Sequence, residues 1–255
     1  MSVCPFPALY LTHGGGPLPL LSHKPHAHLA AWADATLCTV AASSVNSSCV
    51  CTLGGAICLR LKLPPPRNDI RLLWLAQRVS ELLGAAGVKH QQEARGFDHA
   101  AFVPLKLAYP AAEIPVVSLS LLSSMDPQAH IDVGKALAPL RSEGVLIIGS
   151  GSSYHNLRDM LGGGMSMVAP EDVKQQIKVF NTDLRAALTD GRHNPEQREQ
   201  RLAHWEQLAG ARRCHPREEH LLPLMVAFGA GGCSAAEVIY DGAIGDYEVL
   251  SFQFG

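Results

Sequence analysis

The strongest constraint on the fold is an alternation of short apolar segments with amphipathic helical patterns. Five apolar segments have the length and composition of β-strands: 6–12, 114–122, 145–149, 236–240 and 247–254. Four other segments carry apolar residues at helical spacing: 70–83, 131–140, 170–188 and 195–208. Strands that alternate with helices are typical of a parallel sheet covered on both faces. The sequence therefore predicts an α/β fold, a single domain over residues 1–255 with a central, mostly parallel sheet flanked by helices.

Composition narrows the classes of function. Hydrophobic residues make up 47% of the 255 residues and charged residues only 17%, which excludes a disordered, solvating chain. The formal net charge of −2 favours no nucleic-acid or membrane partner, and it leaves the oligomeric state open. The first residues lack the basic start and apolar run of a signal peptide, and the seven cysteines are an odd number, so a cytoplasmic location is expected.

The range 35–59 differs from the rest of the chain because it contains no Asp, Glu, Lys or Arg. It holds four cysteines: Cys38, Cys49, Cys51 and Cys58. A membrane helix would fit its length, but serines, threonines and two adjacent glycines lower its hydropathy, and aromatic or basic flanks are absent. The C-x-C pair has no second pair at the spacing of a zinc site. We expect 35–59 to be an anomalous, divergent segment, partly irregular and loosely packed, with no long regular element in its middle.

Four of the 12 histidines lie where strands end or helices begin: His13, His99, His155 and His220. Open α/β sheets place their sites at such positions, and histidine is both a common metal ligand and a proton carrier near neutral pH. Each also has a structural explanation, respectively as a turn residue, the neighbour of a helix cap at Asp98, a loop residue and a helix-start residue. The remaining histidines have polar or surface-like contexts and are interpreted as structural, while His215 stays undecided.

The segments around these four histidines together resemble the class III extradiol ring-cleavage dioxygenases of the LigB-type superfamily, in particular its 4,5-DOPA dioxygenase-like branch. The segments read THGGGP, GFDHAAFVPLKLAYP, VLIIGSGSSYHNLR and HPREEHLLPLMVAFGAGG, and the C-terminal SFQFG agrees with the same branch. Each segment alone is moderately specific. Their occurrence in the order found in the family makes the combination much more specific than any single segment.

The resemblance implies a non-haem metal, Fe(II) or Zn(II), at the C-terminal edge of the sheet. It implies that His13 and His220 bind the metal, that His155 acts as acid–base or as an additional ligand, and that His99 lines the substrate pocket as a second catalytic residue. The implied enzyme opens the ring of a small, DOPA-like catechol with O₂. Neutral imidazoles suit such a metal, and a nearby histidine can accept and return the catechol proton.

The sequence departs from the family pattern at one ligand. The family places a further metal-binding histidine after its second strand, and the corresponding strand here, expected at 37–45, contains none. Ser43 or Ser44 stands at that point, and a serine hydroxyl is a poor ligand for such a metal. Glu219 and His215 are the next candidates for the missing ligand.

Two other classes of function stay open. One is a catalytically impaired relative that binds a metal or an aromatic ligand without turnover, and the missing ligand supports it. The other is a serine hydrolase that pairs Ser150 or Ser152 with His155. Its support is weak, because the segment is not a G-x-S-x-G elbow and no partner acid is indicated.

Overall fold

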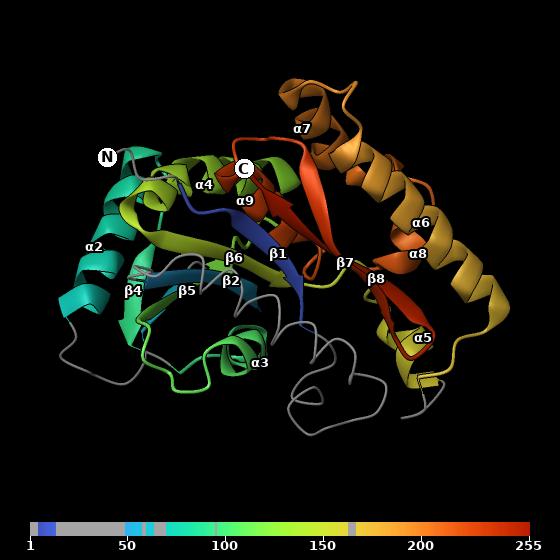
Figure 1. Ribbon diagram of the computed structural model, residues 1–255, viewed down its shortest axis with the longest axis horizontal. Coiled ribbons are helices and arrows are strands. Elements are labelled where there is room, and N and C mark those ends of the chain that lie inside the picture. Colours follow the sequence, from blue (N-terminus) through green and yellow to red (C-terminus); the bar gives the residue numbers. More distant parts are fainter. Residues whose placement is uncertain (1–4, 14–48, 58–59, 64–69, 95, 163–166) are drawn as a thin grey trace.

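The computed structural model describes residues 5–13, 49–57, 60–63, 70–94, 96–162 and 167–255, and one sheet runs through them (Figure 1). Its strands are β1 Ala8–Thr12, β2 Cys49–Ile57, β3 Arg60–Leu63, β4 Gln91–Ala94, β5 Val116–Leu121, β6 Val145–Gly151, β7 Ala236–Ile244 and β8 Tyr247–Phe254. They lie in the order β4-β3-β5-β2-β6-β1-β8-β7. The strand expected at 37–45, with Ser43 and Ser44, lies outside the described residues.

The sheet is mixed, so the expectation of a mostly parallel sheet is wrong. Its centre, β5-β2-β6-β1, is parallel, whereas β3 runs antiparallel to β5, and β8 runs antiparallel to both β1 and β7. Only Gly245 and Asp246 separate β7 from β8, and so short a connection can join strands only in antiparallel orientation. Gly245 has a φ of 62°, which suits this turn.

Helices cover both faces of the sheet. The longer ones are α2 Ile70–Ala85, α3 His99–Ala108, α4 Pro127–Leu137, α6 Glu171–Thr189, α7 Pro195–Ala203 and α9 Leu222–Ala230. Short helical segments are η3 Ala138–Glu143, α5 Leu157–Gly162, η5 Trp205–Gln207 and α8 Ala211–Cys214. The helices form a layer on each face of the sheet, as the sequence predicts for an α/β fold.

Local capping explains where the helices differ from the predicted ranges. The helices expected at 70–83 and 170–188 are confirmed by α2 and α6. The helix expected at 131–140 begins earlier, because the Asp126 side chain accepts a hydrogen bond from the Ala129 amide and caps α4 there. The helix expected at 195–208 ends as α7 before His204, and a separate 3-10 turn follows.

Side chains of β1 alternate between the two faces of the sheet. Leu9 and Leu11 pack in the cluster that includes residues of α3. Ala8 and Tyr10 pack in the clusters that include residues of α9. In Figure 1, α3 lies on the opposite side of the sheet from α4 and α9. β1 is therefore covered on both faces, and His13, which follows it, emerges between the two helical layers.

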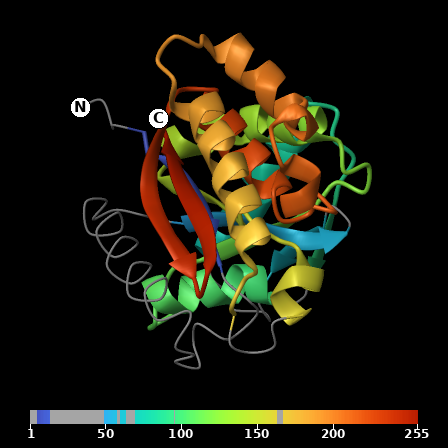
Figure 2. The ribbon, with the colours of Figure 1, turned by 90° about the vertical axis from the view of Figure 1, so that its right-hand side faces the viewer.

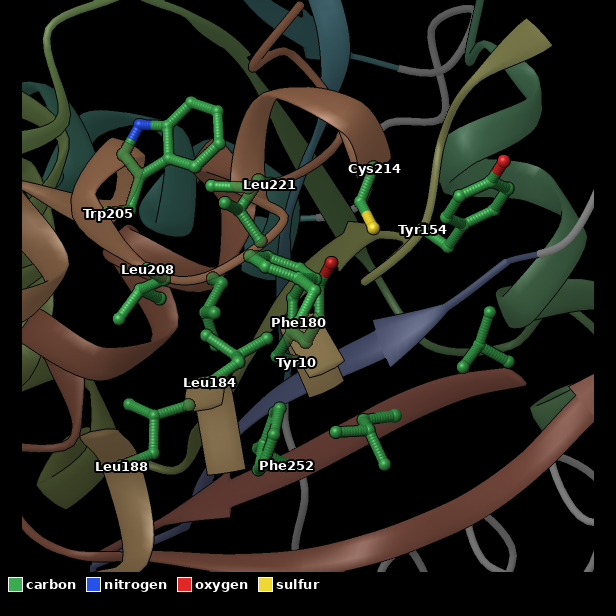
Figure 3. Packing of buried hydrophobic residues seen from close by; sticks show 14 of the residues in the cluster. Tyr10, Tyr154, Phe180, Leu184, Leu188, Trp205, Leu208, Cys214, Leu221 and Phe252 are labelled. Atoms are coloured by element: carbon green, nitrogen blue, oxygen red, sulfur yellow. The ribbon is translucent and has the colours of Figure 1, made fainter. Parts of the chain in front are cut away.

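The largest core cluster lies where α6 packs against the C-terminal hairpin. Tyr10, Phe180, Trp205 and Phe252 are almost completely buried in it (Figure 3). Figure 2 shows α6 alongside the hairpin of β7 and β8, and residues of α6 contact both strands. Full burial of a large apolar side chain contributes about 1.5–3 kcal/mol to stability. The cluster therefore stabilises the position of the hairpin beside β1, and the pairing of β8 with β1 makes β1 an interior strand.

The segment expected to be irregular contains a central strand. β2 lies within the range 35–59 and pairs in parallel with β5 and β6, so the expectation of no long regular element is wrong for 49–57. A strand with neighbours on both sides and helices on both faces disfavours charged residues, which explains their absence from its sequence. The range 35–48 lies outside the described residues. Within the described part of the chain, no helix is long and apolar enough to cross a membrane.

Two glycines of β6 allow the start of α9 to approach the sheet. A Cβ atom at Gly151 would lie 2.1 Å from the carbonyl oxygen of His220, and a Cβ at Gly149 would lie 2.2 Å from that of Pro223. The His220 carbonyl accepts hydrogen bonds from the Ser152 amide at 2.9 Å and from the Tyr10 hydroxyl at 3.0 Å. The backbone of His220 is therefore fixed against the end of β6.

We predict that Gly151→Ala destabilises the protein by about 2 kcal/mol or more, because the added methyl group must displace the His220 backbone. Urea unfolding measures the effect. Gly191→Ala is the matched control, since a Cβ there meets nothing within 4 Å, and its cost should stay within about 0.5 kcal/mol. Equal stability of the two variants would contradict the close contact between β6 and His220.

Candidate metal centre

The four predicted histidines come from four elements that meet at one edge of the sheet. His13 follows β1, His155 follows β6, His220 precedes α9, and His99 is the first residue of α3. β1 and β6 are parallel neighbours whose last residues pair with each other, so both chains leave the sheet at the same edge. Sites of open α/β sheets form at this carboxyl edge.

Three of these histidines converge. The ring centroids of His13 and His99 lie 5.3 Å apart with an interplanar angle of 80°, and those of His13 and His220 lie 5.4 Å apart at 50°. One ligand atom from each of the three side chains lies within 4.8 Å of the others. The predicted cap at Asp98 holds the start of α3, because its side chain accepts a hydrogen bond from the Ala101 amide at 3.2 Å.

A second group of possible ligands overlaps the first. One ligand atom each of His155, Glu219 and His220 lies within 4.8 Å of the others. The rings of His155 and His220 are stacked, with centroids 3.4 Å apart and an interplanar angle of 13°. Glu219 also forms an ion pair with Arg217 at 3.1 Å. Its place directly before His220 in the sequence was the only signal that pointed to this carboxylate.

The predicted metal ligands are thus divided between two groups that share His220. His13 belongs to one group and His155 to the other. Binding of one ion by His13, His155 and His220 together stays a prediction, as do the catalytic roles of His155 and His99. In the structure the His13 ring lies next to the rings of His99 and His220, and the His155 ring stacks on that of His220.

Burial keeps the clustered imidazoles neutral. Burial, together with repulsion from His99 and His155, lowers the pKa of His13 to about 3, although Asp98 acts in the opposite direction. Burial and repulsion from His99 lower the pKa of His155 to about 4. The pKa of His220 is lowered as well, by burial and by the neighbouring histidines. At neutral pH these side chains therefore have free lone pairs, which metal binding requires.

Hydrogen bonds leave ring nitrogens free for a cation. Nδ1 of His13 lies 3.1 Å from the Ser150 hydroxyl, so a proton on Nδ1 leaves Nε2 unprotonated, as in many metal sites. Nδ1 of His220 is buried, and no hydrogen-bond partner for it exists among the described residues. A buried, unpaired imidazole nitrogen is costly, and a bound cation would satisfy it. The residues present therefore fit a divalent metal ion.

His215, left undecided by the sequence, is a core residue. It is completely buried, its Nε2 donates a hydrogen bond to the Ser153 carbonyl at 2.7 Å, and its ring packs in T-shaped contacts with Phe180 and Trp205. His130, interpreted as structural, donates from Nδ1 to the Asp126 carbonyl and accepts from the Leu122 amide at Nε2. Neither belongs to a possible ligand group in the described part of the chain.

The contacts of the two serines do not favour the hydrolase alternative. Ser150 contacts His13, and the Ser152 hydroxyl donates to the Tyr154 carbonyl at 2.8 Å. Both serines are buried. A serine nucleophile must instead reach its base and its substrate.

A cleft of about 380 Å³ opens beside His155 and was not predicted from the sequence. Its lining is rich in arginine: His155, Asn156, Leu157, Arg158, Arg213, Pro216, Arg217 and Glu219. Arg213 forms an ion pair with Asp159, which also accepts a hydrogen bond from the Tyr154 hydroxyl. Arg158 has no ion-pair partner among the described residues. The cleft therefore combines a histidine with positive charge.

The fold and the histidine-lined edge define an α/β protein with a candidate metal centre, and comparison with known proteins gives its family. The family model described as the catalytic LigB subunit of aromatic ring-opening dioxygenase matches residues 71–245. The chain belongs to this LigB family. Membership implies a catalytic metal, which agrees with the grouped histidines.

Proteins named 4,5-DOPA dioxygenase extradiol from Portulaca grandiflora and Beta vulgaris are 44% and 40% identical over 65% and 70% of this chain. The chain spans only 59% and 65% of the length of these two plant proteins. A protein named dioxygenase tasH from Hapsidospora irregularis is 32% identical over 88% of this chain and 78% of its own length. A crystal structure described as the uncharacterized protein JW3007 from Escherichia coli K12 has a TM-score of 0.71 and 26% identity, covering 98% of this chain and 100% of that one.

We predict that His215 makes the metal-free protein sensitive to acid. Burial lowers the pKa of His215 to about 3, whereas an unfolded histidine has a pKa near 6.5, so the unfolded state binds one more proton between these values. Stability attributable to this residue is therefore lost as the pH falls, by about 1.4 kcal/mol per pH unit below pH 6.

Urea unfolding of the metal-free protein in chelator, at pH 7, 6, 5 and 4, measures this loss. His215→Gln keeps an N–H donor for the Ser153 carbonyl but does not titrate, so its stability should fall less steeply by about that amount per pH unit. Parallel pH profiles of the two proteins would show that His215 does not titrate on unfolding.

Proposed function

We propose that this chain is a metal-dependent extradiol dioxygenase that opens the ring of a small catechol with O₂. The observation that carries the proposal is the convergence of His13, His99 and His220 at the carboxyl edge of the sheet, in a chain of the LigB family. The names of the plant relatives favour a DOPA-like catechol as the substrate. We propose a cytoplasmic location on the basis of two free, buried cysteines, Cys214 and Cys233.

His13 and His220 would hold the metal. Bound Fe(II) would supply the chemistry that brings the diol oxygens and O₂ together in one coordination sphere. Fe(II) suits this redox chemistry, whereas Zn(II), which has no redox chemistry, suits the same imidazoles as an inactive substitute. The Ser150 hydroxyl, as a hydrogen-bond acceptor for Nδ1, would fix the orientation of the His13 ring.

His155 would accept the catechol proton on a ring nitrogen. Its lowered pKa, about 4, keeps the imidazole neutral at pH 7 and therefore ready to act as a base. The backbone amide of His155 donates to the Cys214 carbonyl at 3.1 Å, which fixes the residue beside the cleft. His99 is exposed at the start of α3 and its ring neighbours the buried ring of His13, so a substrate that enters from solvent would meet His99 beside the metal.

The arginines of the cleft favour a catechol that carries an acidic group. Arg213 and Arg217 are paired with Asp159 and Glu219, whereas Arg158 is exposed and has no such partner in the described ranges. A guanidinium binds a carboxylate through two parallel hydrogen bonds. The cleft can therefore hold the carboxylate of a DOPA-like molecule while its ring lies near His155.

The runner-up is a family relative that binds a metal or an aromatic ligand without turnover. One observation favours it: β2, the strand next to β6, contains no histidine or carboxylate in its sequence. Oxygen uptake by the metal-loaded protein separates this alternative from the proposed enzyme.

We predict that the chain loaded with Fe(II) under anaerobic conditions consumes one O₂ per L-DOPA and forms a ring-opened semialdehyde. An oxygen electrode and absorbance spectroscopy measure the two changes. His155→Gln should lower turnover by about 10²–10⁴-fold with the iron content unchanged, because only the proton acceptor is lost. His204→Ala, an exposed residue bonded to the Gln200 carbonyl, is the control. Iron binding without oxygen uptake would favour the non-catalytic relative.

We predict that Arg158→Gln raises the KM for L-DOPA about five-fold or more and leaves the KM for unsubstituted catechol nearly unchanged. The reason is loss of one exposed, charge-assisted contact, about 1 kcal/mol. Steady-state oxygen uptake with both substrates measures the difference. Arg192→Gln, whose arginine pairs with Asp190 away from the cleft, should change neither value. Equal effects of Arg158→Gln on both substrates would exclude a carboxylate contact.

A further inference from the structure

We infer that His99 completes the metal centre as a third imidazole ligand beside His13 and His220. This inference rests on the metal centre proposed above, and it changes the role expected for His99 from lining the substrate pocket to binding the ion. Catalytic metal sites commonly use three protein ligands and keep a further position open. Two histidines alone leave that number incomplete.

The neighbouring strand does not supply the third ligand from the described residues. β2 contains Cys49 and Cys51, but these residues pair with Val145 and Ile147 in the amino-terminal half of β6. Ile147 is four residues before the end of β6, and a strand rises about 3.3 Å per residue. The two cysteines therefore lie about 13 Å or more along the strand from the edge where the histidines meet.

The ring geometry of His99 suits a shared ion. Two imidazoles bound to one tetrahedral ion at about 2.0–2.1 Å have ring centroids about 5 Å apart. The distances of 5.3 Å from His13 to His99 and 5.4 Å from His13 to His220 agree with this value. The rings are also inclined to each other by 80° and 50°, so their planes can meet at one point.

The overlapping group is less suited to one ion. The lone pair of an imidazole nitrogen lies in the ring plane, and the planes of His155 and His220 are nearly parallel, with ring centroids 3.4 Å apart. Lone pairs in parallel planes do not converge on one ion. Glu219, the third member, is already paired with Arg217. We therefore assign His155 to proton transfer rather than to the metal.

The fold also fixes His99 where a ligand is needed. Asp98 caps α3 one residue earlier, and Leu105 and Ala108 of α3 pack with Leu9 and Leu11 of β1. The start of α3 is thus tied to the strand that ends just before His13. The Asp98 carboxylate acts electrostatically on His13, and a negative charge there favours a bound cation.

Metal titration of the full chain, made metal-free with a chelator, tests the assignment without substrate. His99→Ala should weaken Zn(II) binding by about 100-fold or more, measured by calorimetry with a competing chelator. His155→Ala and His204→Ala should stay within about three-fold of the parent protein. Circular dichroism confirms that each variant is folded.

A spectroscopic experiment does not depend on loss of binding. Co(II) bound to a thiolate gives an intense near-ultraviolet charge-transfer band, so His99→Cys should show this band, and His99→Ser and His155→Cys should lack it. Unchanged Zn(II) affinity in His99→Ala, absence of the band in His99→Cys, or its presence in His155→Cys would each overturn the assignment.

The outcomes also separate this inference from the proposed activity. A parent protein that binds metal through His99 but consumes no oxygen with catechols contradicts the dioxygenase and leaves the ligand assignment intact. A parent protein that turns over while His99→Ala keeps its metal contradicts only the assignment. A parent protein that binds no divalent metal overturns both.

Discussion

The site depends on a backbone contact between the segment before α9 and the end of β6. The His220 carbonyl accepts two hydrogen bonds there, from Ser152 and from Tyr10, at a point where Gly151 leaves no room for a side chain. These contacts fix the backbone of His220 at its carbonyl group, and so they fix the point from which its side chain extends. The ring of His220 is inclined to that of His13 and stacks on that of His155.

Grouping several histidines in one buried place has an electrostatic cost unless they stay neutral. Burial acts first on each ring, and each charged neighbour would repel the others, so all of these effects lower the pKa values of His13, His155 and His220. A group of imidazoles that resists protonation in this way can still bind a metal cation. At neutral pH a divalent ion therefore meets unprotonated ring nitrogens and does not have to displace protons from them.

Much of the fold and the four histidines could be predicted from the sequence, because both follow from local patterns. His13 and His155 follow apolar strands, and Asp98 caps the helix that begins at His99. β3 and β4 are too short and polar to show strand periodicity. The lack of charge in β2 suggests an anomalous segment, whereas in the structure it accompanies a central position in the sheet. The short connection explains the antiparallel pairing of β7 with β8, but the antiparallel pairings of β8 with β1 and of β3 with β5 join segments distant in the sequence, which local patterns do not encode.

The geometry of the site could not be predicted, because ring orientation depends on long-range contacts. The stacking of His155 on His220 joins residues 65 positions apart, and the arginine-lined cleft assembles from the segment that follows β6, the start of α5, α8 and the segment after α8. The histidines also come from different layers of the fold. His99 starts a helix on one face of the sheet, His220 precedes a helix on the other, and His13 leaves the strand between them. A ligand that contacts all three histidines would connect the two helical layers and the strand at this edge, and it would oppose sliding of either helix across the sheet. Binding at this edge would therefore make the layered fold more rigid.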